Sequence, residues 1–328
     1  VTVRDSPLAQ KASAEGFQVY GVSPTSARPS AALKISEVVE KIKAVIVHTH
    51  EAHALTAAWL ARAHRRMGLV VSRRLAYPLG KSSISLNRYR RVARILAVSR
   101  FVAESVVNSG IDPGKVTVVY DGVEIPPPVS SEDRAKARKL LGIPAEQIVL
   151  GCVGYLLPEK GQELLVRAWP AVLRQSKNCR LWLAGDGPMR PRLESLSQEL
   201  GVAESVRLAG FVEDVSAVYR ALDVFLFPSL AEPLGSSMLA AMAHGLPTVA
   251  VARGAVPEVI KDGENGLLAQ EPEPDQFAAP IVRMLQNPDF AKDLGAAARQ
   301  TIQSGFSAEK MVRGTLEAYN QIIAQGPR

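Results

Sequence analysis

The segment from Phe225 to Leu246 constrains the fold more than any other stretch of the sequence. A short apolar run, Val224–Phe227, is ended by a proline, which is how a buried strand of a parallel sheet usually stops. A polar loop with one acid, Glu232, and a glycine, Gly235, follows, and from Ser236 the pattern becomes helical. The segment predicts a carboxylate beside a helix N-terminus at the carboxyl end of a strand, a place that suits a sugar and its phosphates.

The second half of the chain repeats this alternation of strand and helix. It begins with a predicted strand at Ile148–Val153, and regular alternation of this kind indicates βαβ units and a parallel sheet. Three prolines at 126–128, followed by serines, form the plainest linker. We therefore expect an α/β protein of two domains, residues 1–127 and 128–305, with a further C-terminal helix in 306–328.

The first half is less regular. We expect strands at 17–22 and 44–47 and a long polar and basic excursion at 77–91. Cys152 and Cys179 lie in apolar runs that read as strands, which favours buried thiols over a disulfide and a reducing, cytoplasmic location. The sequence has no uninterrupted apolar run of about 18 residues, the length that a membrane span needs.

The loops of the second half resemble those of family 4 glycosyltransferases, which are retaining, nucleotide-sugar-dependent enzymes of the GT-B type. The resemblance spans nearly the whole chain and is tightest from Val149 to Leu268. It implies two Rossmann-like domains that face a cleft, an acceptor-side one first and a nucleotide-sugar-binding one second. It also implies that the first domain lacks its initial strand and helix, and that the C-terminal helix in 306–328 crosses back to the first domain. The residues that carry the resemblance are Pro228, Ser229, Glu232, Gly235 and the run Met242–Pro247.

The glycine-rich turn 151–161 follows a predicted strand and precedes a helix. Its backbone can therefore approach a diphosphate, which Lys160 can neutralise, although an ordinary βα loop would look similar. The family has an arginine in this loop where this chain has Tyr155, and a second glutamate in the donor segment where this chain has Ala240. The donor-binding residues that the resemblance implies are Gly154, Tyr155, Lys160, Gly185, Asp186, Gly187, Phe211, Val212, Glu232, Leu234, Gly235, Ser236, Ser237 and Ala240.

Three histidines, His48, His50 and His53, lie close together after a predicted strand. A metal site, a structural histidine and a substrate-facing histidine are all open readings, but no further cluster has ligand spacing and no Asp-x-Asp pair occurs. The resemblance implies that His50 faces donor and acceptor. The catalytic residues that it implies are Glu232, Lys160 and His50, with no metal and no cofactor besides the nucleoside diphosphate sugar that serves as donor substrate.

The formal charge of +7 is concentrated in one block, because no acid occurs between Glu51 and Glu104. Such a block favours an anionic partner, namely a membrane surface or a phosphorylated substrate. The alternative is a basic face that is exposed to solvent and binds no partner. Nucleic acid is disfavoured, because the block has few aromatic residues and matches no reader motif. The basic residues are Arg62, Arg65, Arg66, Arg73, Arg74, Lys81, Arg88, Arg90, Arg91, Arg94 and Arg100.

The expected activity is transfer of a sugar, with retention, from a nucleoside diphosphate sugar to an acceptor hydroxyl. We expect a sugar or lipid-linked acceptor, including a cell-envelope glycan, and a cytoplasmic protein peripheral on the inner face of the membrane. The competing hypothesis is a weakened or inactive GT-B-fold binding or scaffold protein, which Ala240 and Tyr155 support. A sugar-nucleotide epimerase of the same fold fits the segment from Pro228 to Gly235 less well.

Overall fold

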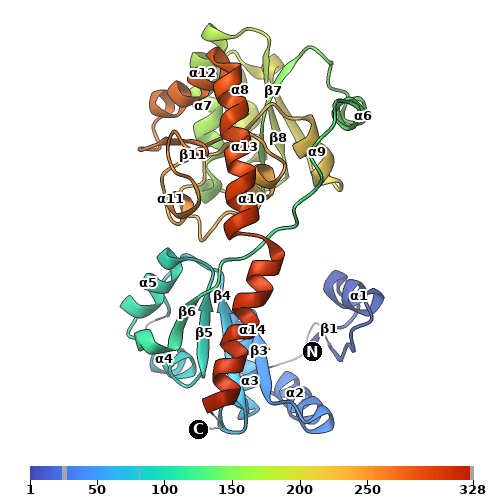
Figure 1. The fold of residues 1–328 in the computed structure, drawn as a ribbon, viewed down its shortest axis with the longest axis vertical. Helices are drawn as coiled ribbons and strands as arrows, with labels where there is room; N and C mark the ends of the chain where they lie inside the picture. The colour runs from blue at the N-terminus through green and yellow to red at the C-terminus, as the bar shows by residue number, and fades with distance from the viewer. Residues whose placement is uncertain (24–27, 81, 326–328) are drawn as a thin grey trace. The chain divides into compact units, whose positions relative to one another are not determined.

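The computed structural model describes residues 1–23, 28–80 and 82–325, and it divides into two compact units (Figure 1). The first unit comprises Val1–Val119 and Val312–Arg328, and the second comprises Tyr120–Met311. Each unit contains its own parallel sheet, of four strands in the first and six in the second. The predicted α/β class with two Rossmann-like domains is therefore confirmed.

The main sheet of the first unit has the strand order β3-β4-β5-β6, and β1 and β2 form a separate parallel pair. Its elements are β1 (Thr2–Val3), α1 (Pro7–Ala14), β2 (Gly21–Val22), α2 (Arg28–Ile42), β3 (Ile46–Thr49), α3 (Ala52–Leu60), β4 (Gly68–Arg73), α4 (Ser83–Arg90), β5 (Arg94–Ala97), α5 (Arg100–Asn108) and β6 (Val116–Val118).

Helix α14 (Ala308–Gln325) packs against the main sheet of the first unit through its last part. Ala318 and Ile322 form a buried cluster with Val70 of β4 and Leu96 of β5. The close approach depends on Gly68, since a Cβ atom there would lie 2.6 Å from Cγ2 of Ile322.

Two predictions for the first unit were wrong in detail. The polar excursion at 77–91 contains helix α4, whose N-cap is Ser82, and Lys81 of the basic block lies outside the described residues. The strand expected at 17–22 is reduced to β2, which pairs with β1, and helix α1 begins after the N-cap Ser6. Both helices start at a capping serine, and their exposed, polar faces gave little hydrophobic periodicity to read.

The sheet of the second unit has the order β12-β11-β10-β7-β8-β9. Its elements are α6 (Ser131–Leu141), β7 (Ile148–Val153), α7 (Gln162–Gln175), β8 (Cys179–Ala184), α8 (Arg190–Glu199), β9 (Val206–Gly210), α9 (Val215–Ala221), β10 (Val224–Phe227), α10 (Ser236–Ala243), β11 (Thr248–Val251), α11 (Val256–Val259), β12 (Leu267–Ala269), α12 (Pro274–Gln286) and α13 (Pro288–Gly305).

Both faces of this sheet are covered, as a run of fully apolar strands predicts. In β10, Val224 and Leu226 join a core built with α7, α8 and α12, while Phe225 packs edge-on against Tyr219 of α9. Strand order reverses between β7 and β10, because successive strands are added on one side of β7 and then on the other. In open sheets of this kind, the crevice at such a reversal, beyond the carboxyl ends of the strands, is where ligands bind.

Helix α13 was not predicted from the sequence, while the two thiols lie as expected. Gly295, within α13, interrupts the helical pattern, and a Cβ atom there would lie 2.3 Å from the carbonyl oxygen of Gly245, so the glycine allows close packing. Cys152 and Cys179 are both buried and unbridged. Within the described ranges, no helix combines the length and apolar character that crossing a bilayer requires.

Candidate active site

An ion pair between Lys160 and Glu232 lies at the strand reversal of the second unit. Lys160 follows β7, Glu232 follows β10, and the two strands are neighbours in the sheet, so their loops meet. The ammonium Nζ is 2.8 Å from Oε2 of Glu232. Glu232 is only 4% exposed, whereas about a third of the Lys160 side chain (32%) remains accessible. A buried carboxylate thus holds a cation whose other side is open.

Ser229 fixes the Glu232 carboxylate from a second direction. Its hydroxyl donates to Oε2 of Glu232 at 2.9 Å, and Ser229 itself is buried. The backbone N–H of Leu230 donates to the carbonyl of Glu159 at 2.8 Å, which joins the loops after β10 and β7. Ser229 was not among the predicted site residues, although its place three positions before Glu232 in the motif was a usable signal.

Two glycines let other backbone segments approach this pair closely. Gly161 has a φ of +70°, and a Cβ atom there would lie 2.2 Å from the carbonyl oxygen of Pro228. A Cβ atom on Gly254, which has a φ of +60°, would likewise lie 2.2 Å from the carbonyl oxygen of Glu232. The same carbonyl oxygen accepts a hydrogen bond from the N–H of Ala255 at 3.0 Å. Any larger residue would push the loops apart, so both glycines are required for the geometry of the pair.

The glycine-rich turns after β7 and β8 lie directly against each other. A Cβ atom on Gly185 would lie 2.0 Å from the carbonyl oxygen of Gly154, and one on Gly187 would lie 2.5 Å from that of Leu156. The carboxylate of Asp186 accepts from the N–H of Gly187 at 2.8 Å, so it serves the turn itself. These predicted donor residues are thus brought together as a surface of bare backbone.

The remaining predicted donor residues differ widely in exposure. Tyr155 and Phe211 present open aromatic rings, with 59% and 83% of their surfaces exposed. Leu234 is buried, while Val212, Ser237 and Ala240 are half-buried and Ser236 is exposed. Gly235 is the N-cap of α10 at φ +101°, so Ser236 and Ser237 supply the first N–H groups of this helix.

His50 belongs to the first unit, where it follows strand β3. Its Nδ1 is 3.0 Å from an Nη atom of Arg74, and its ring centroid is 4.2 Å from that of His48. The side chain is exposed, so it is available to a ligand of this unit. No group of three or more His, Cys, Asp or Glu side chains within the described ranges has the geometry of a metal site.

His48 has a structural environment. Its Nδ1 is 2.6 Å from the hydroxyl of Tyr319 in α14, and its Nε2 is 2.8 Å from the hydroxyl of Ser72 in β4. Burial, reinforced by the nearby His50 and Arg74, lowers the pKa of His48 to about 3. The ring is therefore neutral at physiological pH and joins α14 to the sheet.

Comparison with known proteins accounts for both units. The model of the family "Glycosyl transferases group 1" matches residues 133–301, and that of "Glycosyltransferase Family 4" matches residues 5–125. An uncharacterized glycosyltransferase of Methanocaldococcus jannaschii is 32% identical over 69% of the chain, which spans 59% of that relative's length. A D-inositol 3-phosphate glycosyltransferase of Actinosynnema mirum is 30% identical over 84% of the chain, which spans 72% of its length.

Solved structures share the fold. A glycosyltransferase of Rickettsia africae superimposes with a TM-score of 0.86 at 20% identity, covering 98% of this chain and 89% of its own. HepE of Anabaena, solved with UDP and glucose, gives 0.85 at 22% identity, covering 96% and 89%. The GT-B type of fold is thereby confirmed. With both units matched by the family models, the chain belongs to the group 1, or family 4, glycosyltransferases.

Proposed function

We propose that this protein transfers a sugar from a nucleoside diphosphate sugar to an acceptor hydroxyl, with retention and without a metal ion. The observation that carries the proposal is the Lys160–Glu232 pair at the strand reversal, where ligands of such sheets bind. Support for the donor class comes from HepE, of the same fold, which was solved with UDP and with UDP-glucose.

In this proposal Lys160 stabilises the departing diphosphate. The bond between the anomeric carbon and the diphosphate oxygen breaks, and its electron pair leaves with the diphosphate. The acceptor oxygen bonds to the anomeric carbon in its place, and the acceptor proton passes to the departing diphosphate. The positive charge of Lys160 and the N–H groups at the start of α10 act where this negative charge develops. Gly185 and Gly187 let the turn after β8 pack against the turn after β7, and the nucleoside is assigned to these two turns.

Glu232 is assigned to binding of the donor sugar. Its Oε2 already accepts hydrogen bonds from both Lys160 and Ser229. These bonds hold the carboxylate in place and use the lone pairs of Oε2. Such a group suits hydrogen bonds from sugar hydroxyls better than nucleophilic attack, so no protein nucleophile is assigned. His50 would contact the sugar or the acceptor.

The acceptor in this proposal is a sugar or a lipid-linked glycan, and the protein is cytoplasmic and peripheral at an anionic membrane. The basic block of the first unit supports the membrane part, because a stretch of the chain from Glu51 to Glu104 contains arginines and no acid between its ends. Nucleic acid is not part of the proposal.

A second candidate is a binding or scaffold protein that has lost turnover. It is favoured by Tyr155, whose exposed ring cannot supply the charge of an arginine, and by Ala240, whose methyl group cannot accept hydrogen bonds from a ribose. Both residues weaken binding of a donor, but neither removes Lys160 or Glu232.

The test is a transfer and hydrolysis screen over a panel of nucleotide sugars, with a chelator present and absent. The proposal expects turnover that a chelator does not change, a product anomer that matches the donor, and loss of turnover in Glu232→Gln. Nucleotide binding without any turnover would establish the scaffold hypothesis instead. Turnover that survives in Glu232→Gln would remove this site from the proposal.

A further inference from the structure

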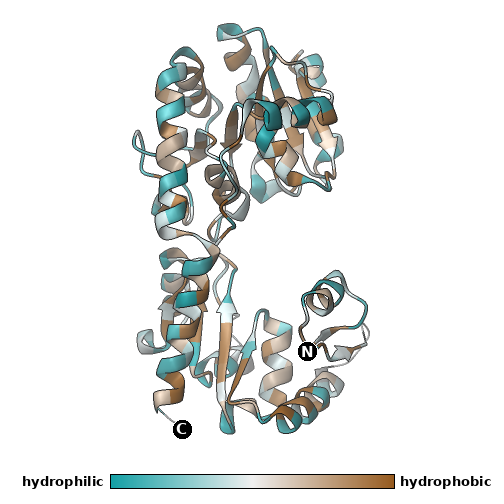
Figure 2. Ribbon diagram, turned by 45° about the vertical axis from the view of Figure 1, so that its right-hand side comes forward, coloured by the Kyte–Doolittle hydropathy of each residue, from teal (hydrophilic) through white to brown (hydrophobic). Residues whose placement is uncertain are grey.

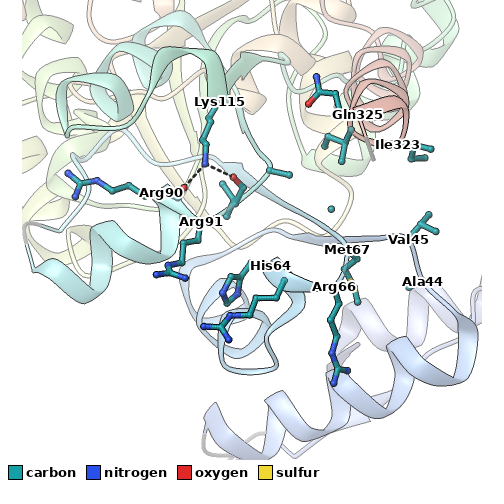
Figure 3. Close-up of a pocket in the computed structure, with 15 residues that line it drawn as sticks. Ala44, Val45, His64, Arg66, Met67, Arg90, Arg91, Lys115, Ile323 and Gln325 are labelled. Atoms are coloured by element: carbon teal, nitrogen blue, oxygen red, sulfur yellow. Dashed lines mark hydrogen bonds between the residues drawn. The ribbon is translucent and has the colours of Figure 1, made fainter. Parts of the chain in front are cut away.

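A pocket of about 570 Å³ lies in the first unit, at the edge of the sheet where its strands begin (Figure 3). Its lining includes Ala44 and Val45 before β3, Gly68 at the start of β4, and Ala93 before β5. His50 follows β3 at the other edge of the same sheet. Because the carboxyl ends of parallel strands carry the usual ligand sites, a pocket at their amino ends needs a separate explanation.

The pocket is basic, and within the described part of the chain no acidic side chain lines it. The basic side chains are Arg65, Arg66, Arg90, Arg91 and Lys115. Arg66 is paired with the exposed Glu40 outside the lining, at 2.9 Å, and Lys115 donates to the carbonyl groups of Arg90 and Val92. The remaining positive charge favours an anion in or over the pocket.

One wall of the same pocket is apolar and open to solvent. Val45 is 66% exposed and Ile323 is 54% exposed. Figure 3 shows these two side chains on one side of the pocket, with Arg90, Arg91 and Lys115 on the other. A free phosphate ion gains nothing from the apolar wall, whereas a ligand with an anionic head and an apolar body matches both sides.

His64 adds a ring nitrogen that lacks a hydrogen-bond partner among the described residues. Its Nδ1 is buried and makes no hydrogen bond to any described residue, while its ring stacks on Trp59 with centroids 5.9 Å apart. Burial, then the charges of Arg91 and Arg65, lower the pKa of His64. Arg65, Arg91 and His64 all line the pocket, so two cations and one imidazole ring surround the same cavity.

We propose that this pocket binds the phosphate head group of an anionic lipid and docks the first unit on a membrane surface. The phosphate lies over Arg65 and Arg91, and Val45 and Ile323 reach toward the acyl boundary. The volume is within the range of small-ligand pockets and exceeds what a bare phosphate ion fills. The inference rests on the membrane part of the proposed function and is independent of sugar transfer.

The first experiment measures co-sedimentation with mixed phosphatidylglycerol and phosphatidylcholine vesicles. We expect Arg65→Gln with Arg91→Gln to weaken binding about thirtyfold, the effect of two basic residues near an anionic surface. The control, Arg4→Gln with Lys11→Gln, removes the same charge from exposed positions of the same unit outside the pocket and should bind nearly as wild type does. Equal losses in both pairs would overturn the pocket and leave diffuse attraction.

The second experiment separates a lipid from a soluble phosphate. Val45→Ser with Ile323→Ser leaves the charge unchanged and should also weaken vesicle binding, while glycerol phosphate should compete poorly. Glycerol phosphate that binds as tightly as vesicles do, or vesicle binding that ignores the serine pair, would contradict lipid binding. The NMR titration of His64 should shift to higher pH with anionic vesicles, and an unchanged titration would also count against the site.

Nucleotide binding by the same variants keeps the two proposals apart. Unchanged nucleotide binding in the arginine and valine–isoleucine pairs shows that the second unit is intact, and an unchanged thermal unfolding transition shows that the first unit is folded. A loss of vesicle binding is then specific to the pocket. Vesicle binding that depends on the pocket in a protein without sugar transfer would refute the proposed activity and leave this inference standing.

Discussion

The two units hold positive charge in opposite ways. In the second unit a single cation, Lys160, is fixed by the buried Glu232 and framed by backbone that glycines bring close. In the first unit several arginines surround one pocket whose described lining contains no acid (Figure 3). A positioned single charge can recognise one group in one place, whereas a cluster responds to charge density and is more sensitive to salt. The difference indicates that the second unit binds one defined small ligand, whereas the first unit binds a negatively charged surface.

Removing the charge of Glu232 should have the largest effect on the activity of the second unit. Glu232→Gln leaves the size of the side chain unchanged but removes the charge that holds Lys160, so we expect turnover to fall about 100- to 1,000-fold, the effect of losing one positioned group at a reaction centre. The measurement is kcat with the best donor of the panel. Glu159→Gln, in the neighbouring loop, is the control, because only the backbone carbonyl of Glu159 is seen to join the loops.

The cation of the same pair should have the next largest effect. Lys160→Ala should weaken binding of a nucleoside diphosphate by about 1.5–3 kcal/mol, the range for hydrogen bonds to charged groups. Calorimetry measures it, with Lys177→Ala, on the loop before β8, as a control that removes the same charge elsewhere in the unit. Equal affinity of wild type and Lys160→Ala for the nucleoside diphosphate would exclude a role of Lys160 in binding phosphate.

The sequence was enough to identify both members of the pair but not their contact. Lys160 and Glu232 each follow an apolar strand and belong to recognisable loops, so local pattern was sufficient. They are 72 positions apart, and only the order of the strands brings the loops together. For the same reason the partner of His48, Tyr319 in α14, could not be read from the sequence.

The features that were missed have different physical causes. Helix α13 contains Gly295, which reads as a helix breaker until its packing against Gly245 is known. Helix α4 is rich in polar and basic residues, so its pattern resembles a loop. The basic pocket was also hidden, because Arg65, Arg91 and Lys115 come from three separate segments, although the acid-free block had indicated the region.

Adding charge at two positions of the second unit should strengthen its binding of a nucleotide. Tyr155→Arg adds a cation in the loop of Lys160, and Ala240→Glu adds a carboxylate on α10, so each should tighten nucleotide binding by about tenfold if the donor lies across these loops. The effects should be nearly additive, because the two residues would touch different parts of the ligand. A titration in which neither variant, nor the pair, binds more tightly would refute this placement of the donor.

The smallest expected effect concerns the first unit alone, where His48 joins α14 to the sheet. The pKa of His48 is about 3 in the folded protein, below the ordinary value of 6.5 that applies when the chain is unfolded. The unfolded chain therefore binds more protons than the folded protein between these two pH values. The stability that neutral His48 contributes is fully present above pH 6.5 and is lost as the pH falls toward 3. At pH 5 the full linkage amounts to about 2 kcal/mol, which we halve to about 1 kcal/mol because the ring is partly exposed to solvent.

His48→Gln isolates this contribution, because glutamine can still hydrogen-bond to Tyr319 and Ser72 but does not titrate. Urea unfolding at pH 7 and pH 5 should show a smaller acid loss in His48→Gln than in wild type. Some loss should remain, since burial also lowers the pKa of His64 and of His244 in the second unit. Identical acid losses in His48→Gln and wild type would mean that His48 is already protonated in the folded protein, and that its bonds to Tyr319 and Ser72 do not hold α14 as described.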